Sequence, residues 1–259
     1  MMKKNTIMDY NKILPIIEIY PCLQGEGKYE GHPIITIRTT GCTHRCHFQA
    51  GGWCDTWYSS IHAKKGLYCF NDFISIANKY PHIKEIMLTG GSPSMHPDIV
   101  NEVICFAKNR NMFVTMETEG SHFFETKYPI DFISLSPKFS NSIPKIGDIT
   151  PKGKVVSEPL INQHNKYRMK HTTIQKIINY HKDYQLKPVW DGSEKVLHEL
   201  KNFISIHNIP NNKVYVMPAG QTRSQLISSY PKVMEMCLKE GFNFTGRTHI
   251  IAYDDKLEV

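Results

Sequence analysis

The sequence predicts an α/β fold in a single domain that spans residues 1–259, and three observations predict it. Short β-rich runs alternate with stretches of helical periodicity, as in proteins whose parallel strands are joined by helices. Nearly every polar or glycine-rich cluster directly follows one of these runs, at the position where the carboxyl ends of parallel strands meet. Finally, 259 residues are enough for one large domain with a well-buried core.

The expected strands are runs rich in β-branched and aromatic residues. They are residues 34–39, 85–89, 112–118, 131–136, 184–190, 213–218 and 242–245. Because helical segments separate most of them, they are expected to pair mainly in parallel, through crossover connections. The clusters that follow them can then converge at one rim although they are spread over most of the chain.

Two of the expected helices have an apolar face at helical spacing. The first covers 97–109, where Pro97 suits the first turn of a helix. The second covers 193–206, and the spacing of Asp191 and Glu194 is that of a capping box. Both helices are expected to pack one face against the sheet.

The end of the chain and one internal segment have weaker patterns. Residues 224–241 show helical periodicity, and Pro231 is expected to open a second helical piece that ends at Gly241. The polar stretch from about 139 to 172 has the poorest pattern and is interpreted as an insertion or a mobile loop within the same domain.

Composition narrows the class of protein. Hydrophobic residues make up 41% of the chain and charged residues 21%, as in ordinary globular proteins. The N-terminal apolar stretch is broken by Pro15 and Glu18, so no signal peptide or membrane span is expected, and the predicted location is the cytoplasm. The formal charge of +7 comes from scattered lysines and arginines. This favours a solvated basic surface over direct nucleic-acid binding.

Cys42, Cys46 and Cys54 lie close together after the first expected strand, in the stretch GCTHRCHFQAGGWCDT. In a reducing compartment such a cluster indicates a metal site more than disulfides. The spacing is compatible with a zinc site completed by His44 or His47, and with an iron–sulfur cluster that keeps one corner open for a ligand. The other four cysteines are isolated and are interpreted as small buried apolar residues: Cys22, Cys69, Cys105 and Cys237.

The three cysteines and the following TGGSP (89–93) resemble the radical S-adenosylmethionine (SAM) superfamily. Its members bind a 4Fe–4S cluster through three cysteines, and an acidic GGEP motif holds the amino group of SAM. The resemblance implies a partial, incomplete β/α barrel with mostly parallel strands, as well as both cofactors.

Seven motifs in order, over nearly the whole chain, resemble the 7-carboxy-7-deazaguanine synthase family. That family carries QGEG, an arginine-containing strand with GC, WCDT, GGEP, ETSG, SPK and QTHK. This chain reads LQGEG (23–27), IRTTGC (37–42), WCDT (53–56), TGGSP (89–93), METEG (116–120), LSPK (135–138) and GRTHI (246–250). Each motif alone is weak, whereas the ordered set is specific.

The resemblance implies roles for individual residues, although it assigns no certain catalytic side chain because SAM supplies the radical. Cys42, Cys46 and Cys54 would hold the 4Fe–4S cluster, and Thr56 would hold Mg²⁺. The expected SAM contacts are Gly90, Gly91, Ser92, Thr118, Ser136 and Lys138. The expected substrate contacts are Gln24, Glu26, Arg38 and His249. Arg38 would bind the substrate carboxylate, which matches a guanidinium group.

The implied reaction is that of a carbon–nitrogen lyase. It converts the pterin 6-carboxy-5,6,7,8-tetrahydropterin to 7-carboxy-7-deazaguanine with loss of ammonia, in 7-deazapurine biosynthesis of the queuosine or preQ0 type. A homodimer and a flavodoxin-like electron donor are implied as partners. Three alternatives remain: an activating enzyme that installs a glycyl radical on a partner protein, a non-enzymatic zinc module that binds nucleic acid, and an inactive or repurposed relative. QGEG and RTH count against the first, and the rim motifs against the second.

Three positions depart from the family's motifs. Seven residues separate Cys46 from Cys54 where the usual pattern has two, and Gly51 and Gly52 are expected to let this loop bulge outward and return Cys54 to the cluster. Ser92 replaces the glutamate of GGEP and supplies no charge, so lower SAM affinity is expected unless backbone carbonyls or Glu117 compensate. Third, arginine stands at position 247 where the family has glutamine.

Overall fold

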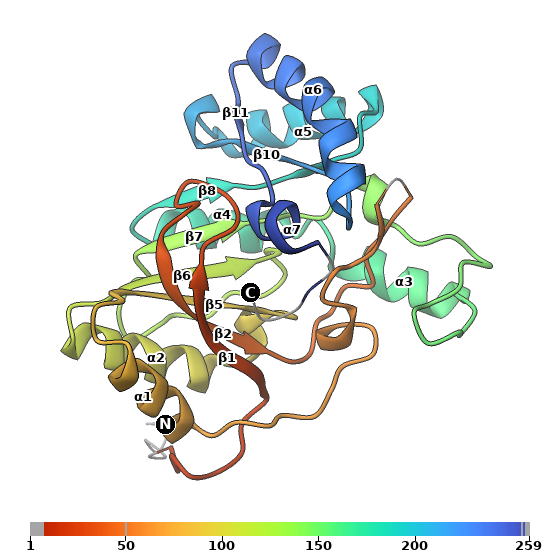
Figure 1. Cartoon of the computed structure of the whole chain (residues 1–259). Helices are drawn as coiled ribbons and strands as arrows, with labels where there is room; N and C mark the ends of the chain where they lie inside the picture. Colours follow the sequence, from red (N-terminus) through yellow and green to blue (C-terminus); the bar gives the residue numbers. More distant parts are fainter. Residues whose placement is uncertain (1–7, 50, 255, 257–259) are drawn as a thin grey trace.

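The computed structural model describes residues 8–49, 51–254 and 256. Its centre is a six-stranded sheet in the order β1-β2-β5-β6-β7-β8 (Figure 1). The strands are β1 (Ile16–Leu23), β2 (Pro33–Thr39), β5 (Glu85–Gly90), β6 (Phe113–Thr118), β7 (Phe132–Leu135) and β8 (Tyr184–Leu186). All neighbours pair in parallel except β1, which runs antiparallel to β2. The predicted α/β fold with a mostly parallel sheet is therefore confirmed, and the sheet is open.

A smaller parallel sheet continues the architecture beyond β8. It consists of β9 (Val189–Trp190), β10 (Tyr215–Pro218) and β11 (Asn243–Phe244), in the order β11-β10-β9. A parallel bridge between Leu186 and Val214 connects it to the edge of the large sheet. The carboxyl ends of strands from both sheets can therefore contribute to one rim.

Helices cover both parts of this architecture. α1 and α2 lie together beside the large sheet, and α5 and α6 lie beside the small one (Figure 1). The helices are α1 (Phe70–Lys79), α2 (Pro97–Asn109), α3 (Glu158–Tyr167), α4 (His171–Tyr180), α5 (Glu194–His207), α6 (Arg223–Glu240) and α7 (Thr248–Tyr253). None of the helices among the described residues is both long and apolar enough to span a membrane.

The core forms where the apolar face of each helix meets the sheet. Ile35 and Ile37 of β2 are fully buried, and Val100 and Val103 of α2 belong to the same cluster. The periodicity that predicted α2 therefore marked its buried face correctly. This apolar layer fixes the sheet from below its rim and leaves the carboxyl ends of the strands free for polar side chains.

The segment 184–190 is two strands rather than the single strand predicted. The backbone N–H of Lys187 still donates to Leu135 of β7, whereas the carbonyl of Pro188 accepts from Met217 next to β9. Proline has no N–H to continue the first ladder. The chain therefore changes sheets at Lys187–Pro188, and this change brings Lys187 to the rim.

Two helix boundaries also differ from the prediction. α5 begins at Glu194 with Ser193 as its N-cap, because the Ser193 hydroxyl accepts from the Val196 N–H, whereas Asp191 accepts from the Ser193 N–H. The predicted capping box is thus wrong. α6 is one helix that contains Pro231, so the predicted second piece is also wrong. A capping box at Thr222 and a buried apolar face hold it together despite the lost hydrogen bond.

The segment 139–172 contains the short turn η3 (Ser140–Ser142), the helix α3 and the first residues of α4. α3 is anchored by His164, which is fully buried. Its Nδ1 accepts from the Arg45 N–H at 3.0 Å, and its Nε2 lies 3.2 Å from the Ser142 hydroxyl. This segment therefore packs against the loop that carries the cysteines.

One half-buried histidine, His181, makes folding sensitive to acid. Burial lowers the pKa of His181 to about 4, and its Nδ1 accepts the Ile130 N–H. The unfolded chain takes up this proton near pH 6.5, so stability is lost as the pH falls from about 6.5 towards 4. We expect His181→Asn, which keeps an acceptor but does not titrate, to reduce the loss between pH 7 and pH 5 by about 2 kcal/mol. Urea unfolding of the metal-free protein at both pH values checks this, and parallel losses in both proteins would contradict it.

Candidate active site

A cavity of about 540 Å³ lies at the carboxyl ends of the strands. Its wall is contributed by the segments that follow β1, β2, β5, β6, β7, β8 and β10, and by α7. The predicted site residues that line it are Gln24, Glu26, Arg38, Cys42, Cys46, Cys54, Thr56, Gly90, Gly91, Thr118, Ser136, Lys138 and His249. Ser92 is fully buried behind the wall. The sheet topology thus brings together the clusters that follow the parallel strands, as the rim pattern predicted. Gln24 and Glu26 reach the same cavity from the end of β1, which runs antiparallel to β2 and was not part of that pattern.

The long gap between the second and third cysteines forms a hairpin. β3 (His47–Phe48) pairs antiparallel with β4 (Gly52–Trp53), and the Gly51 N–H donates to the Phe48 carbonyl at 2.9 Å. Gly52 has φ +84°, a value that glycine adopts without strain. Just past the hairpin, the Cys54 N–H donates to the Cys46 carbonyl at 3.0 Å. The loop therefore bulges outward and returns Cys54 beside Cys46, as expected from the two glycines.

The three thiols all line the cavity. Burial raises the pKa of all three, that of Cys46 to about 12, so a cationic partner is needed to hold them as thiolates. Within the described part of the chain, no group of three or more His, Cys, Asp or Glu side chains is placed to hold one metal ion. His47, one of the two candidate zinc ligands, instead pairs with Asp148 at 2.6 Å and stacks on Trp53.

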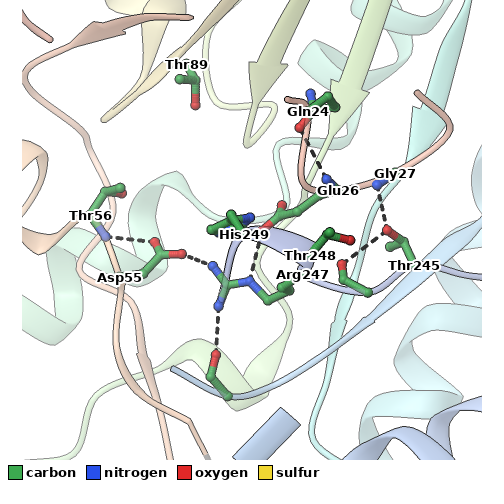
Figure 2. Close-up of polar contacts among 12 residues, drawn as sticks. Gln24, Glu26, Gly27, Asp55, Thr56, Thr89, Thr245, Arg247, Thr248 and His249 are labelled. Atoms are coloured by element: carbon green, nitrogen blue, oxygen red, sulfur yellow. Dashed lines mark hydrogen bonds and ion pairs between the residues drawn. The ribbon is translucent and has the colours of Figure 1, made fainter. Parts of the chain in front are cut away.

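In the same cavity, the QGEG turn enters a network of charged side chains (Figure 2). Glu26 pairs with Lys187 and, at 2.9 Å, with Arg247 Nε. Lys187 also binds Glu117 at 2.6 Å, and Arg247 also binds Asp55. Three carboxylates thus face two cations, which leaves the network one negative charge in excess.

The network keeps Glu26 and Lys187 ionised in the folded protein. Burial alone would raise the pKa of Glu26, but Lys187 and Arg247 outweigh it and hold that pKa far below its usual range. Burial would likewise lower the pKa of Lys187, and Glu117 and Glu26 raise it instead. Near neutral pH, Glu26 is therefore a carboxylate that can accept hydrogen bonds from a ligand in the cavity.

Gly25 fits tightly under the ring of His249. A Cβ atom at position 25 would lie 2.1 Å from His249 Nδ1. We expect Gly25→Ala to displace the imidazole and lower activity by roughly tenfold or more, because small displacements in an active site carry large penalties. In a His249→Ala background the same change should add little, and this double-mutant cycle in steady-state kinetics checks the contact. Equal losses in both backgrounds would contradict it.

The remaining predicted contacts have their own local partners. Arg38 donates to Glu18 and, at 3.2 Å, to the Tyr20 hydroxyl, so part of its guanidinium is already engaged. Lys138 Nζ donates to Ser136 Oγ at 2.9 Å. Gly90 and Gly91 allow close packing of the rim, because a Cβ at either position would meet the backbone of Thr39 or Gly41 within 2.3 Å.

Sequence reasoning missed Glu119 and Lys187. The hydroxyl of Ser92 lies 2.9 Å from each carboxylate oxygen of Glu119, which lines the cavity beside the cysteines. Glu117, which was expected to compensate for Ser92, is bound instead to Lys187 and Thr89. A signal for Glu119 was present in METEG, where a second glutamate stands in place of the serine of ETSG.

The sequence is similar along most of its length to proteins named 7-carboxy-7-deazaguanine synthase, although no family model matches it. It is 31% identical over 251 residues to 7-carboxy-7-deazaguanine synthase from Halobacterium salinarum, covering 95% of this chain and 92% of that protein. It is 30% identical over 237 residues to the synthase of the same name from Rhodopirellula baltica, covering 92% and 85%.

The fold is similar to that of a solved structure, titled crystal structure of QueE from Escherichia coli. The TM-score is 0.58 with 19% sequence identity, over 91% of this chain and 94% of the other. At this identity the likeness supports the fold, and the two synthases above carry the argument about family.

Proposed function

The chain belongs to the 7-carboxy-7-deazaguanine synthase family, and on that premise we propose that its rim cavity converts 6-carboxy-5,6,7,8-tetrahydropterin to 7-carboxy-7-deazaguanine with loss of ammonia. The observation that carries the proposal is the convergence of three cysteines, a glycine-rich loop and a charged QGEG turn on one cavity. Similarity to synthases over 95% of the chain favours this reading over a glycyl-radical activating enzyme or a zinc module.

Cys42, Cys46 and Cys54 would hold a 4Fe–4S cluster, and the wall formed by Gly90, Gly91, Thr118, Ser136 and Lys138 would hold SAM. When bound, these cofactors supply the one-electron chemistry that begins with hydrogen abstraction from the substrate. The protein's contribution is to bind and orient the cofactors and the substrate and to keep water out of the cavity.

The polar side chains at and around the QGEG turn are suited to binding the pterin. Glu26, held ionised by Lys187 and Arg247, can accept hydrogen bonds from the N–H groups of the pterin ring. Gln24 offers both a donor and an acceptor. Arg38 carries the positive charge for the substrate carboxylate, and Glu18 and Tyr20 fix its orientation. Burial lowers the pKa of His249, which is therefore neutral near pH 7 and can donate or accept a hydrogen bond.

We also propose that Mg²⁺ binds at Thr56, supported by the oxygen atoms available there and by the excess negative charge of the network. Thr56 Oγ1 lies beside Cys54, and the Asp55 carboxylate accepts from the Thr56 N–H at 2.7 Å. A hard cation with few protein ligands suits such a site. Arg247 competes for Asp55, because its guanidinium already binds that carboxylate.

This competition predicts the effect of restoring glutamine at position 247. We expect Arg247→Gln to lower the Mg²⁺ concentration for half-maximal activity by roughly tenfold, since a cation a few ångströms away is removed. A Mg²⁺ titration of product formation, with the exposed Arg110→Gln as a control, measures it. An unchanged or weaker Mg²⁺ response would contradict the proposed site.

Further features are proposed on the family resemblance and on local support. The mostly parallel large sheet and the small parallel sheet, joined at Leu186 and Val214, support an incomplete β/α barrel. The seven free cysteines support a reducing, cytoplasmic setting. A flavodoxin-like electron donor and a homodimer rest on the resemblance alone.

The substrate assignment can be tested by comparing two pterins. After anaerobic reconstitution with iron and sulfide, 5′-deoxyadenosine is measured with SAM, a reductant and either 6-carboxytetrahydropterin or the same ring without its carboxylate. The proposal expects rapid SAM cleavage only with the carboxylated pterin. Equal cleavage with both pterins, or without any pterin, would contradict the assignment.

A further inference from the structure

Glu119 is a buried carboxylate without a basic partner. It is 6% exposed and lines the cavity near Cys42 and Lys138. Its carboxylate accepts a hydrogen bond from Ser92, whose single hydroxyl proton can serve one carboxylate oxygen at a time. The nearest imidazole atom, His44 Nδ1, is 3.9 Å away, beyond hydrogen-bond distance. Within the described ranges, no lysine or arginine lies within 4 Å of it.

The other carboxylates of the cavity differ in this respect. Glu26, Asp55 and Glu117 are each paired with Lys187 or Arg247. Taking a carboxylate out of water without a cation is strongly unfavourable. A ligand is therefore expected to bring the positive charge that balances Glu119. The ligand group must be a cation small enough to reach a buried oxygen.

A charge of the opposite sign lies on the same wall. Lys138 donates to Ser136 and forms no ion pair among the residues that the structure describes. Glu119 and Lys138 are more than ion-pair distance apart and both line the cavity with the cysteines. An unpaired anion and an unpaired cation on one wall are complementary to a zwitterionic amino acid group. The amino acid end of SAM carries these two charges.

Compared with the family motifs, the side-chain types at positions 92 and 119 are exchanged between two neighbouring strands. β5 and β6 pair in parallel, and the segments that follow them carry Ser92 and Glu119. The family motifs have glutamate at the first position and serine at the second, whereas this chain has serine first and glutamate second. The carboxylate and the hydroxyl are both retained, on opposite strands, and they remain in contact.

We propose that Glu119 binds the ammonium group of SAM and that Ser92 is its positioning residue. The inference rests on the proposed function, because SAM is the ligand that this function brings to the cavity. It assigns the charged contact to the rim of β6, whereas Ser92 keeps the carboxylate aimed at the cavity. Lys138 then faces the carboxylate of the same amino acid end.

Ligand binding tests the inference without measuring turnover. S-adenosylhomocysteine, which keeps the amino acid end and is not cleaved, and its analogue without the amino group are dialysed against the reconstituted protein. We expect Glu119→Gln to weaken the binding of S-adenosylhomocysteine by roughly ten- to hundredfold, the usual effect of losing a hydrogen bond to a charged group. The analogue without the amino group should bind the wild type and Glu119→Gln equally.

The exchanged pair provides the matched control. The double variant Ser92→Glu/Glu119→Ser should recover affinity to within a few fold of wild type, because it places the carboxylate on the other strand. Equal iron content in all variants shows that the cluster is unaffected. If the wild type binds S-adenosylhomocysteine and Glu119→Gln binds it equally well, or loses both ligands alike, the role of Glu119 is wrong and the proposed function stands. If the wild type binds neither ligand, the proposed function itself fails.

Discussion

Replacing Cys54 by alanine is expected to abolish stable binding of the iron–sulfur cluster and to reduce product formation by roughly three orders of magnitude or more, because the cofactor carries the difficult step. The hairpin of β3 and β4 has a clear structural purpose in this account. It accommodates the residues between the second and third cysteines and returns Cys54 to the backbone of Cys46. In Cys54→Ala only Cys42 and Cys46 remain as ligands, and two thiolates are too few to bind the cluster stably.

The measurement is iron and sulfide content after anaerobic reconstitution, together with the visible absorption of the cluster. Cys105→Ala is the matched control, since Cys105 lies on α2, away from the cavity lining. The Cys105→Ala variant should have the same iron content as the wild type. Unchanged iron in Cys54→Ala would remove Cys54 from the set of ligands and leave the hairpin without this purpose.

Replacing Lys187 by methionine is expected to destabilise the fold by about 3–5 kcal/mol, the usual effect of removing one partner from a buried ion pair. Lys187 is 4% exposed and lies between Glu26 and Glu117. Without it, two buried carboxylates lose their shared cation. Lys201→Met is the matched control, because Lys201 pairs with Glu240 at the surface and should change stability by less than about 1 kcal/mol.

The pH dependence separates this cause from simple loss of packing. The pKa of Glu26 is depressed in the folded protein, so its contribution is present above the unfolded pKa, about 4.3, and is lost as the pH falls below it. The deficit of Lys187→Met should therefore shrink between pH 7 and pH 4, as the uncompensated carboxylates become protonated. Urea unfolding across this range measures it. A deficit independent of pH would point to packing and contradict the charge network.

The rim of the site could be predicted from sequence because polar clusters follow the strands and parallel strands share a carboxyl end. This reasoning needs only local patterns, which is why Cys42, Gly90 and His249 were placed correctly at one cavity. The hairpin was foreseeable for the same reason, from two glycines in a short segment.

The ion pairs of the site could not be predicted, because they join residues far apart in the chain. Lys187 meets Glu26 and Glu117 only because the chain changes sheets at Pro188, and the LKPVW pattern suggested one continuous strand. The Ser92–Glu119 contact likewise depends on the register of β5 and β6 beyond their last paired residues. The ion pairs of Lys187 have no local signal in the sequence, and METEG shows the extra carboxylate of Glu119 without showing its contact with Ser92.

The identity of the product decides whether this protein contracts the pterin ring. The reconstituted protein is incubated anaerobically with SAM, a reductant, Mg²⁺ and 6-carboxytetrahydropterin, and the products are identified by mass spectrometry. We expect 7-carboxy-7-deazaguanine, formed together with 5′-deoxyadenosine and ammonia. An intact cluster that cleaves SAM but leaves the pterin ring unchanged would contradict it.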